Sequence, residues 1–341
     1  MAIGSTRYIN LLLTRFPALG VKVYLFFGCF IAVIALTQWR ANARETTAEA
    51  QYPAIGEIVM TDGVPVHVHV SGTGPDLVLI HGASGNLRDF TFGLTGHLTD
   101  HYRVITFDRP GMGWTGRLPG TAGAWNTLSE TPQEQAAILQ RAADQIGVKN
   151  PVVLGHSYGG AVALAWGLAR PSDTAALVLV SAASEPWPGS LGWVYAATSS
   201  ALGGAVLIPL VTAYLPESVV DASVSSIFAP QDPPEGYVDH IGSGLTLRRA
   251  STRANAQQVN GLLPYIIEMK KQYGTLTMPI EILHGDADTI VPAAVHAEVL
   301  INDVPNGALT LLPGLGHMPH HTNPETVVDA IGRAATRAGL R

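Results

Sequence analysis

Hydrophobic residues occur along most of this chain in short uninterrupted runs and not in strict alternation with polar ones. Six runs of six to eight residues follow residue 75, and helical stretches separate them. Continuous aliphatic strands of this kind are typical of parallel sheets that helices cover on both faces. The pattern predicts an α/β fold with a mostly parallel central sheet and helices on both faces. The runs are residues 76–81, 102–108, 151–156, 175–182, 279–285 and 308–314.

Residues 57–72 predict a β-hairpin, because a Thr-Asp-Gly turn precedes a stretch in which every second residue is valine. We interpret His67 and His69 as the outward face of its second strand. A metal would need a third ligand, and none lies near them in the sequence. We therefore expect neither a metal nor another cofactor in this protein.

One helix start is marked clearly. Thr131 is a candidate N-cap, Pro132 suits the first helical position, and Glu134 completes a capping box. A helix is therefore predicted from residue 132 onward.

The regular spacing of strands breaks once, between residue 183 and residue 279. About 90 residues are far too many for an ordinary crossover connection, so this region predicts an inserted cap. Residues 186–216 contain no Asp, Glu, Lys or Arg, which favours an apolar lid over a pocket. A second membrane helix in this region is disfavoured, because it would place the last two strands of the sheet on the opposite side of the bilayer from the other strands. After its N-terminal segment, we divide the chain into a first core segment (55–184), a cap (185–275) and a second core segment (276–341).

Residues 1–45 are interpreted as a membrane anchor or a signal segment, and residues 46–53 as a polar connection to the main domain. The apolar stretch 23–36 is shorter than the roughly 20 residues of a spanning helix, but residues 19–39 suffice if Lys22 extends to the interface. The sequence Ala-Asn-Ala at 41–43 is a possible signal-peptidase site. We favour an uncleaved anchor with the main domain outside the cytoplasm; the alternative is a secreted or periplasmic protein after cleavage.

Composition excludes other classes of protein. The 341 residues carry a net charge of −6 and no sustained basic run, so a nucleic-acid partner is not expected. The single cysteine, Cys29, excludes an internal disulfide framework. The oligomeric state stays open.

Ser157 lies between a predicted strand and a predicted helix, in the sequence Gly-His-Ser-Tyr-Gly. A tight reversal at this position needs glycines nearby, and Gly155, Gly159 and Gly160 provide them. Such a corner exposes the serine oxygen at the start of a helix, where free N–H groups stabilise negative charge. The pattern alone could also be a glycine-rich turn capped by a serine. Its strand and helix context favours a nucleophile elbow.

A serine hydroxyl needs a base, and the base needs an acid to orient it. Asp286 and Asp288 end one predicted strand, and His317 follows the next. Strand ends at one edge of a parallel sheet converge in space, so Ser157, one aspartate and His317 can form a triad. His320 and His321 compete with His317 for the role of base.

Five ordered motifs resemble the α/β-hydrolase fold superfamily, from about residue 57 to the C-terminus: HGASG (81–85), DRPGMG (108–113), GHSYGG (155–160), GDADTIVP (285–292) and GHMPHHTNPE (316–325). The branch with an inserted cap, which contains esterases and carbon–carbon hydrolases, is the most similar. The resemblance implies Asp288 as the acid, His317 as the base and the N–H of Ala83 as one oxyanion donor. The N–H of Tyr158, directly after the nucleophile, is expected to be the second donor.

We expect a serine hydrolase that cleaves a small-molecule carboxylic ester with an apolar or lipid-like acyl group. Arg248, Arg249 and Arg253 of the cap keep open an alternative, a carbon–carbon hydrolase of a ring-cleavage keto acid. An acyltransferase or perhydrolase would use the same triad. A ligand-binding receptor on the same fold is the non-enzyme alternative.

Overall fold

The computed structural model describes residues 17–341, which contain one mixed sheet in the order β1-β2-β4-β3-β5-β6-β7-β8. β1 and β2 form the predicted antiparallel hairpin, and β3 to β8 run parallel to one another. All six aliphatic runs form strands, which confirms the predicted fold class. The strands are β1 (Glu57–Thr61), β2 (Val64–Ser71), β3 (Asp76–Ile80), β4 (Arg103–Phe107), β5 (Val152–His156), β6 (Ala176–Val180), β7 (Ile280–Gly285) and β8 (Gly307–Leu312).

Helices cover both faces of the sheet. Val78 and Ile80 of β3 join the core cluster beneath α4 and α5, whereas Leu77 and Leu79 join the cluster beneath α3 and α15. Alternate residues therefore face opposite layers, and both layers are apolar, which is why the strand sequences are continuous aliphatic runs. The core helices are α3 (Arg88–Thr91), α4 (Pro132–Gln145), α5 (Tyr158–Ala169), α13 (Ala297–Asp303), α14 (Pro319–Thr322) and α15 (Pro324–Arg337), with short 3-10 turns η1 (Leu94–His97), η2 (Pro171–Asp173) and η4 (Tyr273–Thr275).

His67 differs from its expected position on the outward face of β2. The side chain is 2% exposed, and its Nδ1 lies 2.6 Å from Oδ2 of Asp108. Its Nε2 accepts a hydrogen bond from the Gly56 backbone, and its own N–H donates to Thr115 Oγ1. The loop after β4 covers this end of the strand, which the local alternation of β2 could not reveal.

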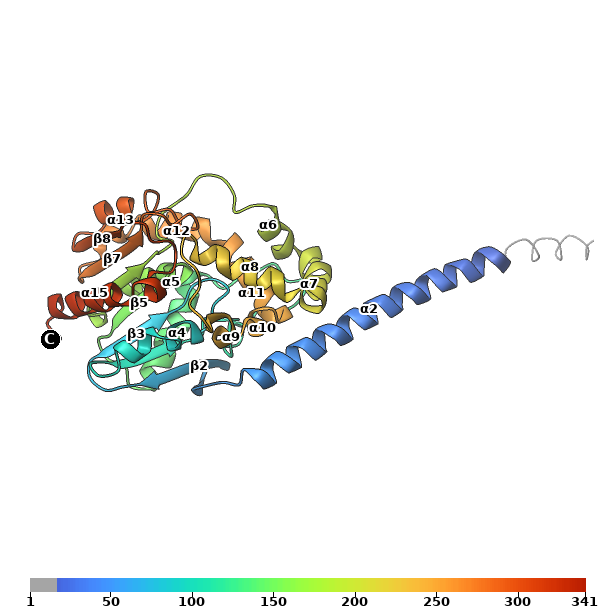
Figure 1. The fold of residues 1–341 in the computed structure, drawn as a ribbon, viewed down its shortest axis with the longest axis horizontal. Helices are drawn as coiled ribbons and strands as arrows, with labels where there is room; N and C mark the ends of the chain where they lie inside the picture. Colours follow the sequence, from blue (N-terminus) through green and yellow to red (C-terminus); the bar gives the residue numbers. More distant parts are fainter. Residues whose placement is uncertain (1–16) are drawn as a thin grey trace, which may run out of the picture.

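The segment between β6 and β7 forms a cap of helices at one end of the sheet (Figure 1). The bend between α6 and the following helical segment is 87°, so this uncharged stretch is not one straight helix. Several of its apolar side chains, including Trp193, Leu202 and Val206, are exposed. The cap contains α6 (Trp193–Ser199), a π-helical turn η3 (Gly203–Leu207), α7 (Ile208–Tyr214), α8 (Glu217–Phe228), α9 (Tyr237–Ile241), α10 (Ser243–Thr246), α11 (Arg249–Asn260) and α12 (Leu262–Lys270).

The N-terminal helix α2 (Pro17–Gln51) projects from the body as a long rod (Figure 1). Among the described residues it is the one unbroken helix long and apolar enough to cross a membrane, as an anchor or a signal sequence would be. Its second half contacts the cap, where Arg40 and Arg44 donate to the carbonyls of Ala213 and Leu215 at 2.7 and 2.9 Å.

The helix α2 also extends past the expected boundary at residue 45. We expected a polar connection from residue 46, but the helix continues to Gln51. Glu45 and Glu49 bind Arg249 and Arg248 of the cap at 2.7 and 3.0 Å, so the polar side chains that suggested a connection hold the helix on the cap instead.

The capping box of α4 gives a test of local stability. Thr131 Oγ1 accepts from the Glu134 N–H at 3.1 Å, and Glu134 Oε2 accepts from the Thr131 N–H at 2.9 Å. We expect Thr131→Ala to lower the free energy of unfolding by about 1 kcal/mol, because the first turn of the helix loses the side chain that caps it. Urea denaturation measures the change. Thr277→Ala, at an exposed threonine outside any helix, serves as the control and should change it by less than about 0.5 kcal/mol.

Candidate active site

The backbone at Ser157 is held in a conformation that side chains rarely adopt. Its φ of 53° and ψ of −120° place the residue at a sharp reversal between β5 and α5. Three backbone hydrogen bonds fix this corner: the Ser157 N–H donates to Val180, and the Ser157 carbonyl accepts from Gly160 and Ala183, at 2.9 to 3.1 Å. Strained backbone of this kind persists where the surrounding structure enforces it, and it is common at functional sites.

The glycines around Ser157 are required by close backbone contacts. A Cβ on Gly155 would strike the carbonyl of Gly159, and a Cβ on Gly159 would strike the carbonyl of Ile80. A Cβ on Gly160 would collide with the Cβ of Ala182 on the neighbouring strand end. The start of α5 therefore packs directly against β3 and β6, which places the serine at the carboxyl edge of the sheet.

Asp288 and His317 meet at the same edge. Nδ1 of His317 lies 2.7 Å from Oδ2 of Asp288, and both side chains are buried. Oδ1 of Asp288 accepts from the N–H groups of Ile290 and Val291, both at 2.9 Å. Burial alone would raise the pKa of Asp288, but hydrogen bonds from His284 and His317 outweigh it and lower the pKa well below its usual value. The carboxylate is therefore ionised and holds Nδ1 of His317 as a donor.

Asp286 has a different environment. It is exposed, and its Oδ1 accepts from the Gly314 N–H at 2.7 Å, a contact that fixes the loop leading to His317. Of the two aspartates considered from the sequence, Asp288 is the one in contact with the histidine.

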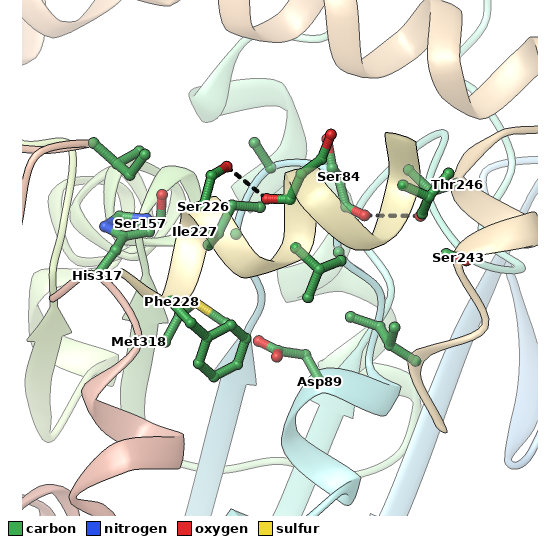
Figure 2. A pocket seen from close by; sticks show the side chains of 18 of the residues that line it. Ser84, Asp89, Ser157, Ser226, Ile227, Phe228, Ser243, Thr246, His317 and Met318 are labelled. Atoms are coloured by element: carbon green, nitrogen blue, oxygen red, sulfur yellow. Dashed lines mark hydrogen bonds between the residues drawn. The ribbon is translucent and has the colours of Figure 1, made fainter. Parts of the chain in front are cut away.

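Ser157 and His317 line one cavity of about 500 Å³ between the sheet edge and the cap. Figure 2 shows the Ser157 hydroxyl beside the His317 ring at one end of this cavity. Because Nδ1 of His317 is bound to Asp288, Nε2 is the ring nitrogen that remains for another partner.

The two expected oxyanion donors have free N–H groups. Within residues 17–341, neither the Ala83 nor the Tyr158 N–H donates to a protein acceptor. Tyr158 is the first residue of α5, so its N–H has no helical partner, and Ala83 follows β3 and lines the cavity. Both groups are therefore available to a ligand.

The competing histidines bind elsewhere. Nε2 of His320 and Nε2 of His321 lie 3.1 and 2.8 Å from the two oxygens of Asp89, whose Oδ1 also accepts from the hydroxyl of Tyr237 at 2.7 Å. Nε2 of His156 donates to the His317 carbonyl at 3.0 Å. Asp89, His156 and His320 have the residue types of a metal site. The hydrogen bonds described above explain why these three residues lie together: they form a network that supports the loop of His317.

Sequence reasoning missed Asp89, because its partners are more than 140 positions away and no motif includes it. It also gave no role to Arg109, although this residue lies in the quoted DRPGMG motif. Arg109 is fully buried, and its Nη2 donates to the Gly82 carbonyl in the loop of residues 81–85 after β3, which we call the oxyanion loop.

The fold and this site define a hydrolase of the α/β class. The family model of the alpha/beta hydrolase family matches residues 77–330, and the chain belongs to that family.

Individual relatives agree with this assignment. The chain is 26% identical over 271 residues to a pimeloyl-[acyl-carrier protein] methyl ester esterase of Aeromonas hydrophila, covering 78% of this chain and 97% of the relative. It is similar in structure to the esterase RhEst1 of Rhodococcus sp. (TM-score 0.62, 22% identity, 83% and 98% coverage). It also resembles a membrane phospholipase A described as a bacterial virulence factor (TM-score 0.61, 20% identity, 95% and 98% coverage).

The buried histidines predict a loss of stability in mild acid. Burial lowers the pKa of His81 and of His296 to about 4, and it lowers that of His156 as well. Between this value and about 6.5, the unfolded chain binds protons that the folded chain does not. Each such histidine therefore costs up to about 1.4 kcal/mol of stability per pH unit as the pH falls.

One group opposes this trend. Burial raises the pKa of Glu185 to about 7, so the folded state holds a proton there that the unfolded state has lost. The stability lost through the three histidines on acidification exceeds the stability gained through the one glutamate. We therefore expect the free energy of unfolding, measured in urea, to be lower at about pH 5 than at about pH 6.5. Glu185→Gln should steepen the loss. A free energy that stays constant or rises on acidification would contradict the neutral state of these histidines.

Proposed function

We propose that this protein is a serine esterase in which Ser157 is the nucleophile, His317 the general base and Asp288 the acid that orients it. The observation that carries the proposal is the buried Asp288–His317 hydrogen bond, with Ser157 held at a strained corner of the same cavity. In this arrangement His317 removes the hydroxyl proton as the serine oxygen attacks the ester carbonyl carbon. The N–H groups of Ala83 and Tyr158 bind the resulting oxyanion.

Collapse of the tetrahedral intermediate breaks the ester bond. The leaving alcohol takes the proton from His317, and the acyl group stays on Ser157. Water then attacks the acyl-enzyme, again with His317 as base, and the carboxylic acid departs. Each step uses the same imidazole, and its positive charge is stabilised by the ionised Asp288.

The cavity favours an apolar acyl group. Much of its lining is aliphatic or aromatic and comes from the cap, including Tyr195, Leu215, Val224 and Phe228. Asp89 is the one carboxylate among the lining residues, and its oxygens are bound by His320, His321 and Tyr237. Together with the apolar helix α2, this lining supports a lipid-like ester as substrate, and the likeness to a membrane phospholipase A agrees with it.

The position of three arginines argues against a keto acid. Arg248 and Arg249 bind Glu49 and Glu45 of α2, and Arg253 donates to the carbonyls of Asn126, Thr198 and Ser200. No lysine or arginine is found among the residues that line the described cavity. A carbon–carbon hydrolase would need a cation there for the substrate carboxylate, so we rank it second. Transfer to an acceptor other than water would use the same geometry.

An uncleaved membrane anchor is the localisation we propose, with the catalytic domain outside the cytoplasm. The possible signal-peptidase site at 41–43 lies inside α2, and Ala41 is fully buried against the cap. A peptidase would have to detach this turn, which Arg40 and Arg44 fasten to the end of α7.

Substitutions in the triad test the mechanism. Wild type should react with a fluorophosphonate probe, and Ser157→Ala should not. We expect Asp288→Asn to lower kcat for p-nitrophenyl octanoate by about 10,000-fold, because the histidine loses its orienting acceptor. Asp286→Asn is the matched control, since Asp286 holds only the loop, and its effect should be about tenfold or less. An unlabelled wild type would favour the ligand-binding receptor.

A chain-length series tests the substrate class. We expect kcat/KM for p-nitrophenyl esters to rise from acetate through butyrate to octanoate, because each buried methylene is worth about 0.8 kcal/mol. Steady-state kinetics in detergent micelles at fixed detergent concentration measure the trend. Hydrolysis of a ring-cleavage keto acid in the absence of ester hydrolysis would reverse the order of the two candidate functions.

A further inference from the structure

We propose that Arg109 is a positioning residue that, together with Asn255 and Gln258 of the cap helix α11, sets the orientation of the oxyanion donor at Ala83. The proposal rests on the proposed function. It gives the buried cation of Arg109 and the cap a role in orienting the oxyanion donor, which is a function outside the triad.

Arg109 binds the oxyanion loop through two carbonyl groups. The residue is fully buried, its Nη2 donates to the Gly82 carbonyl at 3.0 Å, and its Nε donates to the His81 carbonyl at 3.0 Å. The Gly82 carbonyl and the Ala83 N–H belong to one planar peptide unit, in which they point in opposite directions. The hydrogen bond from Arg109 fixes the direction of the Gly82 carbonyl. It thereby directs the Ala83 N–H the opposite way, toward the cavity that Ala83 lines.

His81 supports the same carbonyl. Its Nδ1 lies 2.8 Å from the Gly82 oxygen, and its Nε2 accepts from the Arg109 N–H at 3.0 Å. These two contacts require the proton on Nδ1, which donates to the carbonyl. The Gly82 oxygen thus accepts two hydrogen bonds, and one of the donors carries a charge.

The second oxyanion donor contacts the same guanidinium. Cζ of Arg109 lies 4.4 Å from the centre of the Tyr158 ring. Gln135 joins the pair, because its Oε1 accepts from Arg109 at 2.9 Å and its Nε2 donates to the Tyr158 hydroxyl at 3.1 Å. One side chain therefore contacts both the peptide unit that carries the Ala83 N–H and the ring of Tyr158.

The charge of Arg109 is not neutralised by a direct partner. Among the ion pairs formed by residues 17–341, none includes Arg109, whose acceptors are carbonyl and amide oxygens. Burial lowers its pKa to about 10, so the side chain is protonated at neutral pH. A buried cation without a carboxylate is costly to keep. Here it polarises the peptide whose N–H faces the developing negative charge.

The cap holds the other side of the loop. Asn255 Oδ1 accepts from the Ser84 N–H at 2.7 Å, and Thr246 Oγ1 donates to the Ser84 carbonyl at 2.8 Å, a contact drawn in Figure 2. Ser84 has a φ of 57°, a conformation that costs about 1 kcal/mol or more and persists only where the surrounding structure enforces it. Gln258 completes the connection by accepting from Nη1 of Arg109 at 2.9 Å.

The test compares two substrates that differ in one atom: p-nitrophenyl octanoate and its thionoester, in which sulfur replaces the carbonyl oxygen. Sulfur accepts hydrogen bonds weakly, so an intact oxyanion hole favours the oxygen ester. The ratio of kcat/KM for the two substrates reports the oxyanion hole and is independent of the fraction of protein that is folded. The variants are Arg109→Gln, Arg109→Lys and Asn255→Ala in the full chain.

We expect Arg109→Gln to lower kcat on the oxygen ester by about 10- to 100-fold, to leave KM within about twofold, and to lower the ester-to-thionoester ratio by about tenfold. Arg109→Lys should recover part of the ratio, because an ammonium retains the charge and can donate hydrogen bonds but lacks the planar fork of the guanidinium. Asn255→Ala should shift the ratio in the same direction by a smaller factor.

Arg117→Lys is the matched control. The Arg117 side chain is 8% exposed and contacts Gln257 of α11, but it binds Glu130 and no carbonyl of the oxyanion loop. The ester-to-thionoester ratio of Arg117→Lys should equal that of the wild type. An unchanged ratio in both Arg109→Gln and Asn255→Ala would overturn the proposal. If Arg109→Gln does not fold, Asn255→Ala and Arg109→Lys decide alone. A wild type that hydrolyses neither substrate would instead contradict the proposed esterase function.

Discussion

The strained reversal at Ser157 is the constraint on which the rest of the site depends. Its left-handed backbone exists because β5, α5 and β3 approach so closely that Gly155 and Gly159 leave no room for a Cβ. That approach exposes the serine oxygen and the first N–H of α5 together. It also brings the loop after β3 beside the serine, since the Gly159 position contacts the carbonyls of Ile80 and His81. The proposed nucleophile and the two proposed oxyanion donors are thus positioned by one close packing contact.

The helix α11 connects two regions of the molecule that the sequence separates. At its N-terminal end, Arg248 and Arg249 bind Glu49 and Glu45 of α2. About two turns later, Asn255 holds the oxyanion loop. The apolar helix and the reacting centre are therefore attached to one rigid element of the cap. In this structure the cap is a support for the site as well as a wall of the cavity.

The sequence predicted those features whose causes are local. The strands were predictable because β3 to β7 are buried on both faces, and α4 was predictable because Thr131 and Glu134 satisfy its first N–H groups. Strand order brought Ser157, Asp288 and His317 to one edge, as their motifs suggested. Features with distant causes were missed. His67 is buried by a loop more than 40 residues away, and the last turns of α2 are held by cap arginines about 200 residues away.

The buried charges around the site match the charge separation that the proposed ester cleavage requires. Burial keeps His81, His156 and His296 neutral, so the field at the reacting atoms is set mainly by groups that stay ionised. On the side of the oxyanion loop that group is the cation of Arg109, and behind His317 it is the anion of Asp288. In the transition state the substrate oxygen becomes negative and the imidazole becomes positive. A protein that places opposite buried charges behind these two atoms before the reaction begins stabilises that separation without having to rearrange.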